Sequence, residues 1–464
     1  MAVTGESWSA QEVDTIEHFL ASRDVPGVAI ALVHNGEIVK DGGFGKANLL
    51  SGAGPDEHTM WPIASLTKSF TAVAAMQCVE AGLLDLDAPV QDYIPDVLVA
   101  DASTTSRLTM RRLLTHTSGL GRTGHQDRTR EESVNPYPTR EALVAALDSV
   151  VPQAPVGACF SYSNESYALA GRIIELLRER PLEDCFQEHI FDAVGMRRTT
   201  PRFGLWRDDS NRTYLYAGRN IGPYGSGEQH AGYEVVDLVG DYQTFLSTGG
   251  IASNAHDLAL YQLASMNYVD SPLGLTGAAL EHMQSVQHSY GDSGWGYGLG
   301  YRMMRSGAIR VVGHSGGLPG VSTYSLMIPG EGAGVVVLTN RSDIKAFTLA
   351  EQLMSLLRGP VWRTDLSEPL PIKSAWGAPS ADDLAPYLGD YRFRRGPATV
   401  SQGATGIVLR TPSRYDGPVV EVHTRRVARD RFISLGDGQI IEFRRDGSGN
   451  ICAFLNSGYV YERS

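Results

Sequence analysis

Ser65 and Lys68 are the residues whose types and spacing most directly predict chemistry. They stand three positions apart in the segment 61–73, Trp-Pro-Ile-Ala-Ser-Leu-Thr-Lys-Ser-Phe-Thr-Ala-Val. Positions i and i+3 share one face of a helix, so the Lys68 amine can lie beside the Ser65 hydroxyl and take its proton. The apolar residues around the pair predict a buried amine, and burial favours the neutral form that can act as a base. Since Ser-x-x-Lys arises readily by chance, two exposed helix residues are the alternative interpretation.

Two later segments add polar groups in a fixed order. The first contains Tyr162, Ser163 and Asn164, and the second is His-Ser-Gly-Gly at residues 314–317. With these three segments, the chain resembles the serine β-lactamase and penicillin-binding-protein superfamily, in particular its class C-like branch of D-aminopeptidases, esterases and stand-alone acyltransferases. Three connecting segments also resemble this family: Leu-Leu-Thr-His-Thr-Ser-Gly-Leu (113–120), Ser-Thr-Gly-Gly-Ile (247–251) and Trp-Gly-Tyr-Gly-Leu-Gly (295–300).

The resemblance implies a role for each polar residue. Ser65 attacks a carbonyl carbon and forms an acyl-enzyme, while Lys68 and Tyr162 share the proton transfers as base and then as acid. A packed aromatic with a satisfied hydroxyl is the commoner fate of a tyrosine, and the Tyr-x-Asn pattern outweighs it here. Asn164 orients Lys68 and the substrate amide. The backbone N–H groups of Ser65 and Gly317 are expected to form the oxyanion hole.

His314 departs from the penicillin-directed members, which carry the lysine of Lys-Thr-Gly at this position. That lysine attracts the carboxylate of the substrate as a permanent cation, whereas a histidine is mostly neutral at pH 7. β-Lactamase or D,D-carboxypeptidase activity is therefore not expected as the main role. A neutral His314 beside the tyrosine hydroxyl could relay a proton; the alternative is a core histidine satisfied by a backbone carbonyl. His116 lies in a turn signature and is expected to be structural.

Composition indicates an enzyme in a reducing compartment. The chain has 464 residues, 42% of them hydrophobic, and a net charge of −12, which disfavours nucleic acid and anionic membranes as partners. Cys78, Cys159, Cys185 and Cys452 show no disulfide framework, and the histidines show no metal-ligand spacing, so neither disulfides nor a metal or other cofactor are expected. The first residues lack the pattern of a signal peptide and no run could span a bilayer, so a cytoplasmic location is expected.

The pattern of the first 358 residues predicts an α/β sandwich. Strands are expected at 28–33 and 37–39 around an Asn-Gly turn, and again at 309–312 and 335–339. Helical periodicity lies between them, at 65–81, 140–148, 167–178 and 255–266. Helices between two strand sets predict that the ends of this domain complete one antiparallel sheet.

A second domain is expected after a proline-containing linker at residues 359–381. Between 382 and 464, seven short strand-like runs alternate with turns, which predicts a small antiparallel β-barrel. Its opening segment, Leu-Ala-Pro-Tyr-Leu-Gly-Asp-Tyr (384–391), resembles the lipocalin-like appendage of some relatives. The barrel is either a stabilising module or a lid that sets substrate length. Arg463 in its last strand is a candidate for binding a substrate carboxylate.

The architecture and His314 together look most like the penicillin-binding-protein-type thioesterases. These release and macrocyclise nonribosomal peptides by passing a D-residue from a carrier or thioester to serine and then to the peptide's own amine. The expected substrate is therefore a peptide or small acyl compound, free or carrier-bound. The alternatives are a D-stereospecific peptidase, amidase or esterase with water as acceptor, and a non-catalytic penicillin-recognising protein.

Overall fold

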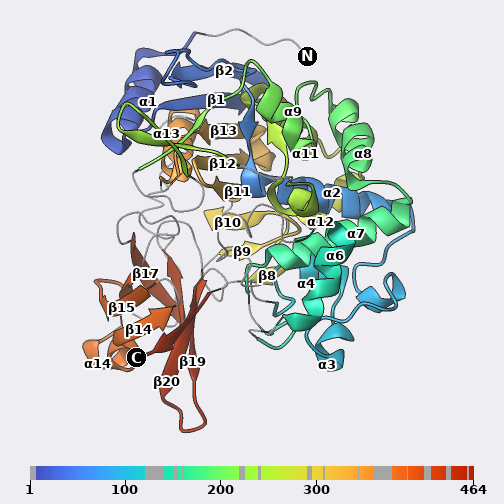
Figure 1. Cartoon of the computed structure of the whole chain (residues 1–464), viewed down its shortest axis with the longest axis vertical. Coiled ribbons are helices and arrows are strands. Elements are labelled where there is room, and N and C mark those ends of the chain that lie inside the picture. Colours follow the sequence, from blue (N-terminus) through green and yellow to red (C-terminus); the bar gives the residue numbers. More distant parts are fainter. Residues whose placement is uncertain are drawn as a thin grey trace.

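Eight antiparallel strands form the central sheet in the computed structural model (Figure 1). The first strand pairs with the last one of the sheet, so the two ends of this α/β domain meet, which confirms the predicted sandwich. In spatial order the strands are β2 (Glu37–Gly45), β1 (Gly27–His34), β13 (Ala333–Thr339), β12 (Val321–Ile328), β11 (Ile309–Leu318), β10 (Arg302–Ser306), β9 (Trp295–Tyr297) and β8 (His288–Ser289).

The structure describes most of the chain. The described residues are 7–120, 137, 139–150, 152, 154–158, 160–218, 225–238, 242–289, 295–306, 309–342, 344–358, 379–393, 396–411, 420–434, 440–456 and 459–464. Within these ranges no helix has both the length and the apolar character needed to cross a bilayer. Cys78, Cys185 and Cys452 carry free thiols, and Cys159 lies outside the described residues.

Strand β1 shows how the sequence separates the two faces of the sheet. Val28, Ile30 and Leu32 pack on one side with the helices α1 (Ala10–Arg23) and α13 (Ala346–Arg358). The residues between them, Ala29, Ala31 and Val33, belong to the other core, which contains the long helices of the opposite face (Figure 1). Because both faces are covered, the strand is apolar throughout rather than alternating.

The opposite face carries the helices that position the polar residues. The helix after Ser65 is almost wholly buried, in keeping with the apolar run Ala-Val-Ala-Ala-Met at residues 72–76. These helices are α2 (Thr67–Glu80), α3 (Ala102–Thr105), α4 (Met110–Leu114), α6 (Arg140–Ala145), α7 (Asn164–Arg178), α8 (Leu182–Phe186), α9 (Phe203–Asp208), α10 (Leu246–Gly249), α11 (Ala255–Met266) and α12 (Gly277–Met283). Two small sheets lie beside them: β3 (Trp61–Pro62) with β7 (Ala252–Ser253), and β4 (Leu215–Ala217) with β6 (Tyr233–Val236) and β5 (Gly225–His230).

The C-terminal strands close into an eight-stranded barrel, as predicted. The strands are β14 (Gly389–Phe393), β15 (Gly396–Gln402), β16 (Ile407–Thr411), β17 (Val420–Ala428), β18 (Arg431–Ser434), β19 (Ile440–Arg445), β20 (Ile451–Asn456) and β21 (Tyr459–Arg463), preceded by the short helix α14 (Ala381–Leu384). Strand β15 was not among the predicted runs, because Gly396 and Pro397 at its start are turn residues by type. The predicted linker lies mostly outside the described residues, so its boundaries stay a prediction.

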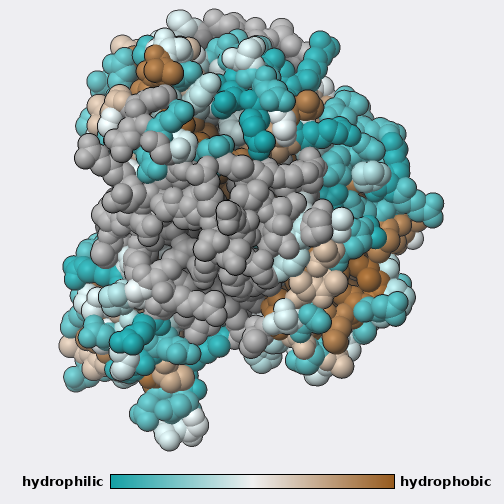
Figure 2. Space-filling view, viewed as in Figure 1, coloured by the Kyte–Doolittle hydropathy of each residue, from teal (hydrophilic) through white to brown (hydrophobic). Residues whose placement is uncertain are grey.

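Aromatic side chains fill the interior of the barrel. Tyr391, Phe432, Phe443 and Phe454 are buried, and their rings meet edge-on or tilted at centroid distances between 4.9 and 6.1 Å. The coloured part of the barrel surface that faces the viewer in Figure 2 is mostly hydrophilic, and the larger brown areas lie over the helices near α3 and α4. In its described residues, therefore, the barrel has a packed core rather than a hollow for a ligand.

Candidate active site

Ser65 lies on a 3₁₀ turn, Ala64–Leu66, directly before α2. Ala64 has a φ of 51°, in the left-handed region that costs a non-glycine residue about 1–2 kcal/mol. The turn therefore replaces the regular helix that the spacing predicted, while Lys68 lies in the first turn of α2. The two side chains still meet, with 3.2 Å between Lys68 Nζ and Ser65 Oγ.

The Lys68 amine is fully buried and its neighbours direct it toward Ser65. It donates to Asn164 Oδ1 at 2.9 Å and to the backbone carbonyl of Thr248 at 2.7 Å. Both oxygens only accept hydrogen bonds, so they hold two of the amine's hydrogens in either protonation state. Once the amine has lost its third proton, its lone pair is left for the side where Ser65 lies. This is the geometry of a general base.

Tyr162 completes the proton-transfer group. Its hydroxyl forms hydrogen bonds with the side chains of Lys68 and Ser65, and its ring centroid is 4.9 Å from Lys68 Nζ. Burial raises the pKa of Tyr162, but the charge of Lys68 and the hydrogen bonds from Lys68 and Ser65 outweigh it, so the net shift is downward. A tyrosine with a lowered pKa can exchange its proton with serine and with a leaving group.

Asn164 and the turn at His116 hold this group in place. Asn164 is the first residue of α7, whose start is capped by the Ser163 hydroxyl accepting from the Ser166 N–H at 3.1 Å. His116 has a φ of 56°, accepts from the Ser163 N–H at Nδ1 (3.1 Å), and places its ring 4.1 Å from that of Tyr162. These contacts are those of a positioning residue, in line with the structural role expected for His116.

The strand β11 passes directly beside the nucleophile. A Cβ at Gly316 would collide with Thr323 Oγ1 and with the backbone oxygen of Ile63, and Thr323 Oγ1 donates to that oxygen at 3.0 Å. Gly317, by contrast, has open space where its Cβ would be. The backbone at Gly317 is therefore accessible next to the Ser65 turn, where the sequence predicted half of the oxyanion hole.

His314 meets a tyrosine other than the one expected. Its Nδ1 donates to the backbone oxygen of Ser315 at 2.7 Å, so its Nε2 accepts from the Tyr297 hydroxyl at 2.8 Å, while the Tyr162 ring lies 6.2 Å away, centroid to centroid. Burial, with the charges of Arg302 and Lys68, lowers the pKa of His314 well below its usual range. The imidazole is thus neutral, and the hydroxyl beside it belongs to Tyr297.

Three contributors were not assigned a role from the sequence. Tyr297 and the Thr248 carbonyl lie in segments that were recognised only as family-like, and those segments were the available signal. Arg302 on β10 is a buried guanidinium whose charge lowers the pKa of both Tyr162 and His314. A single arginine in a strand has no distinguishing sequence pattern, so nothing in the sequence indicated it.

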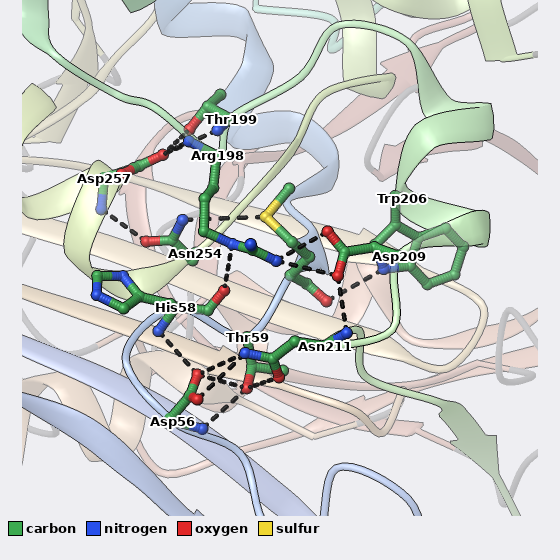
Figure 3. A network of polar contacts seen from close by, with 11 residues as sticks. Asp56, His58, Thr59, Arg198, Thr199, Trp206, Asp209, Asn211, Asn254 and Asp257 are labelled. Carbon is green, nitrogen blue, oxygen red and sulfur yellow. Dashed lines mark hydrogen bonds and ion pairs between the residues drawn. The ribbon is translucent and has the colours of Figure 1, made fainter.

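A polar network braces the segment that leads to Ser65 (Figure 3). Arg198 donates from Nε to the backbone oxygen of His58 at 3.1 Å and from Nη2 to both carboxylate oxygens of Asp209, at 3.0 and 2.8 Å. Trp206 Nε1 donates to the Met60 oxygen at 3.1 Å, and Asp257 accepts from the Arg198 N–H at 2.9 Å. The approach to the nucleophile is thus fixed from α9 and α11.

Arg463 is not brought together with these residues by any described contact. Its Nη1 donates to the backbone oxygens of Pro386 (2.9 Å) and Ile451 (3.3 Å), and its Nη2 donates to that of Leu388 (2.9 Å). The guanidinium therefore fastens the start of the barrel to its last strands, and a carboxylate-binding role stays a prediction. Among the described residues, no three His, Cys, Asp or Glu side chains are arranged to hold a metal.

A buried lysine and a tyrosine with a lowered pKa lie beside one serine, next to an accessible strand. Together these groups define a serine hydrolase or acyltransferase. The Beta-lactamase family model matches residues 13–357, and the chain belongs to that family.

Curated relatives agree with this assignment. Penicillin-binding protein 4 of Amycolatopsis lactamdurans is 27% identical over 392 residues, which are 80% of this chain and 94% of that protein. Protein flp of Staphylococcus aureus (strain MW2) is 25% identical over 353 residues, which cover 74% of this chain and 66% of that protein. The chain therefore spans nearly all of one relative and about two thirds of the other.

Two solved structures match almost the whole chain, and a third matches three quarters of it. The octameric penicillin-binding protein homologue from Pyrococcus abyssi matches with a TM-score of 0.66 and 25% identity, covering 97% of this chain and 99% of that one. SurE matches with a TM-score of 0.67 and 22% identity over 98% of both chains, and it is also solved with D-Leu. The D-amino acid amidase from Ochrobactrum anthropi SV3 covers 75% of this chain and 99% of its own, with a TM-score of 0.60 and 23% identity.

Proposed function

We propose that the protein transfers the acyl group of a peptide from a thioester or ester to an amine through an acyl-enzyme on Ser65. The peptide carries a D-residue at its acylating end, and the amine is its own, so the product is a macrocycle. The neutral His314 carries this proposal, because an uncharged imidazole occupies the position where the penicillin-directed members carry a cationic lysine. A carboxyl group that is already esterified has no charge to pair there.

The steps balance with the residues in place. Lys68 and Tyr162 take the Ser65 proton as Oγ attacks the acyl carbon, and the N–H groups of Ser65 and Gly317 face the developing oxyanion. The thiolate or alkoxide leaves with that proton. The incoming amine then loses a proton to the same pair, and Ser65 recovers its hydroxyl as the amide forms.

An exposed strand edge supports a peptide substrate. Strand β10 pairs with β11 only as far as Gly313, so in the described part of the chain residues 314–318 have no strand partner on that side. Such an edge can bind an extended peptide through backbone hydrogen bonds. Structural neighbours support a D-residue at the acylating position: SurE is solved with D-Leu, and the D-amino acid amidase is solved with D-phenylalanine.

Intact-protein mass spectrometry with a linear peptidyl thioester ending in a D-residue tests the proposal. Wild type is expected to show an acyl adduct that Ser65→Ala lacks, and the adduct should resolve to a product one water lighter than the free acid. Matched substrates ending in the L-residue, and with the terminal amine acetylated, should give no cyclic product. If wild type released only the free acid from the D-residue substrate with a free terminal amine, the proposed cyclisation would be wrong.

A D-stereospecific amidase, peptidase or esterase is the second candidate. The same acyl-enzyme serves it with water as acceptor, and the fold shared with the D-amino acid amidase favours it. Turnover of D-amino acid amides with little turnover of the thioester would support this alternative. The third candidate, a non-catalytic penicillin-recognising protein, requires that no acylating probe labels Ser65.

A further inference from the structure

Three guanidinium groups meet three consecutive residues of one loop, 156–158. Arg107 donates from Nη2 to the Val156 oxygen at 3.2 Å, and the Arg112 guanidinium lies against Gly157, where an added Cβ would be 2.9 Å from its Cζ. The third group comes from the barrel: Arg431, on β18, donates from Nη2 to the Ala158 oxygen at 3.2 Å. The loop is therefore held from both domains.

This loop leads directly to the catalytic tyrosine. Tyr162 is four positions beyond Ala158. On the far side of Ala158, the Ser161 N–H donates to the His116 oxygen at 2.7 Å. On the near side, the Gly157 N–H donates to the Thr117 oxygen, also at 2.7 Å. The contact from Arg431 to Ala158 thus lies between two backbone anchors, at Gly157 and Ser161, shortly before Tyr162.

The barrel orients Arg431 outward and pairs it with a glutamate on the neighbouring strand. The next residue, Phe432, is fully buried in the barrel, and neighbouring residues of a strand point to opposite faces. Across the sheet, Glu442 on β19 pairs with Arg431, Nε to Oε2, at 3.0 Å. His288 on β8 lies close enough to Arg431 and Arg112 that burial and these two charges lower the pKa of His288 to about 4. The end of the guanidinium is thus fixed where the domains meet.

We propose that Arg431 is a positioning residue for Tyr162, so that the barrel acts on catalysis by holding the tyrosine loop and not by holding a ligand. Because aromatic side chains fill the interior of the barrel, the barrel acts through its outer face. The proposal rests only on acyl transfer through Ser65, whichever acceptor follows. It goes beyond the alternatives of a lid and an inert stabilising module.

Arg410 offers a matched control for the experiment. It also pairs across barrel strands with a glutamate, Nε to Oε2 of Glu421 at 2.8 Å, but its described contacts stay within the barrel. Single-turnover acylation of Ser65 by a p-nitrophenyl ester is measured with steady-state kcat and KM, the pH–rate profile and the melting temperature. Arg431→Ala is expected to lower kcat about tenfold with KM within about twofold, since a misplacement of 1 Å can cost up to about a hundredfold.

The pH–rate profile distinguishes positioning from loss of stability. In Arg431→Ala, Tyr162 should move away from Lys68, and the limb of the pH–rate profile that reports the ionisation of the tyrosine should shift. Arg431→Lys keeps a charged hydrogen-bond donor and should therefore retain part of the kcat that Arg431→Ala loses. Arg410→Ala should match wild type in all readouts. Equal losses in Arg431→Ala and Arg410→Ala, or a wild-type kcat and profile in Arg431→Ala, would overturn the proposal.

Glu442→Gln provides a second variant if Arg431→Ala does not fold. It keeps the size of the side chain but weakens the pair that orients Arg431. A folded Glu442→Gln protein is expected to lose kcat in the same direction as Arg431→Ala, by about twofold to fivefold for a weakened charged hydrogen bond. A wild-type kcat in that folded variant would contradict the positioning role. Complete absence of Ser65 labelling in wild type would instead reject the proposed function itself.

Discussion

Lys68 and Tyr162 beside Ser65 are buried, and so is the interior of the barrel, yet the two regions are built in opposite ways. Around Ser65, a lysine, a tyrosine and an asparagine lie together, and Ala64 and His116 adopt left-handed backbone conformations. Inside the barrel, aromatic rings contact one another, and the Tyr391 hydroxyl is satisfied by the Tyr387 oxygen at 2.8 Å. The group around Ser65 thus combines buried polar side chains with two left-handed backbone positions, whereas the barrel interior is stabilised by apolar burial.

This difference predicts that substitutions near Ser65 change rate more than stability, and that substitutions inside the barrel do the reverse.

Ser65→Ala should abolish turnover and covalent labelling, because the acyl group has no other oxygen positioned to receive it. The melting temperature should stay within about 2 °C of wild type, since one hydroxyl on an existing turn is lost. Stopped-flow acylation and calorimetry measure the two quantities. A folded, fully active Ser65→Ala variant would show that Ser65 is not the nucleophile.

Tyr162→Phe should lower kcat by about a hundredfold or more, as expected for a general acid–base group. Tyr167→Phe is the matched control, because its ring is also near Lys68 Nζ (5.4 Å) but its hydroxyl donates to the Leu114 oxygen at 2.7 Å. That control should lose stability by about 1 kcal/mol with a small change in rate. Equal rate losses in the two variants would show that burial of the hydroxyl, and not its contact with Ser65, matters.

Phe454→Ala should destabilise the barrel by about 3–5 kcal/mol, since its ring stacks on Tyr461 at 4.5 Å and meets Tyr391 at 4.9 Å. Differential scanning calorimetry should show an earlier transition, while Ser65 labelling persists at temperatures where the barrel is folded. Arg410→Ala, on the outer surface, is the control for stability. An unchanged transition in Phe454→Ala would contradict the packed aromatic core.

His256→Gln should remove a small, pH-dependent part of the stability. His256 Nδ1 lies 2.6 Å from Asp41 Oδ2, linking α11 to β2, and this hydrogen bond raises the pKa of His256 above 6.5. The stabilisation is complete below pH 6.5 and is lost as the pH rises through the raised pKa. The difference in melting temperature between wild type and variant should therefore shrink as the pH rises above about 6.5.

His423 in the barrel is the matched control for that experiment. It also lies beside a carboxylate, with 2.9 Å to Glu421 Oε1, but its side chain is 61% exposed. Its replacement by glutamine should change stability little at any pH, because exposed pairs contribute about 0–1 kcal/mol. A difference between wild type and His256→Gln that grows with pH would have the wrong sign for a raised pKa.

The sequence predicted the elements of the fold well where local patterns were strong. The Asn-Gly turn lies between β1 and β2, and the periodic run at 255–266 is α11 to the residue. Strand β15 was missed because its first residues are typical of turns, and closure of the barrel pairs it on both sides nonetheless. Pairing between distant strands therefore decided what local propensity could not.

Residue types and spacing by themselves determined the chemistry, since Ser65 and Lys68, three positions apart, can exchange a proton wherever a helical turn brings them together. The tertiary structure alone decided which partners surround them. The Thr248 carbonyl, the Tyr297 hydroxyl and the Arg302 charge come from segments more than 150 positions from Ser65, and nothing local in those segments indicates where they go. The same holds for Arg431, whose contact with Ala158 exists because two separately packed domains meet at that loop. Contacts between distant segments depend on the packing of the whole chain, and no local pattern encodes them.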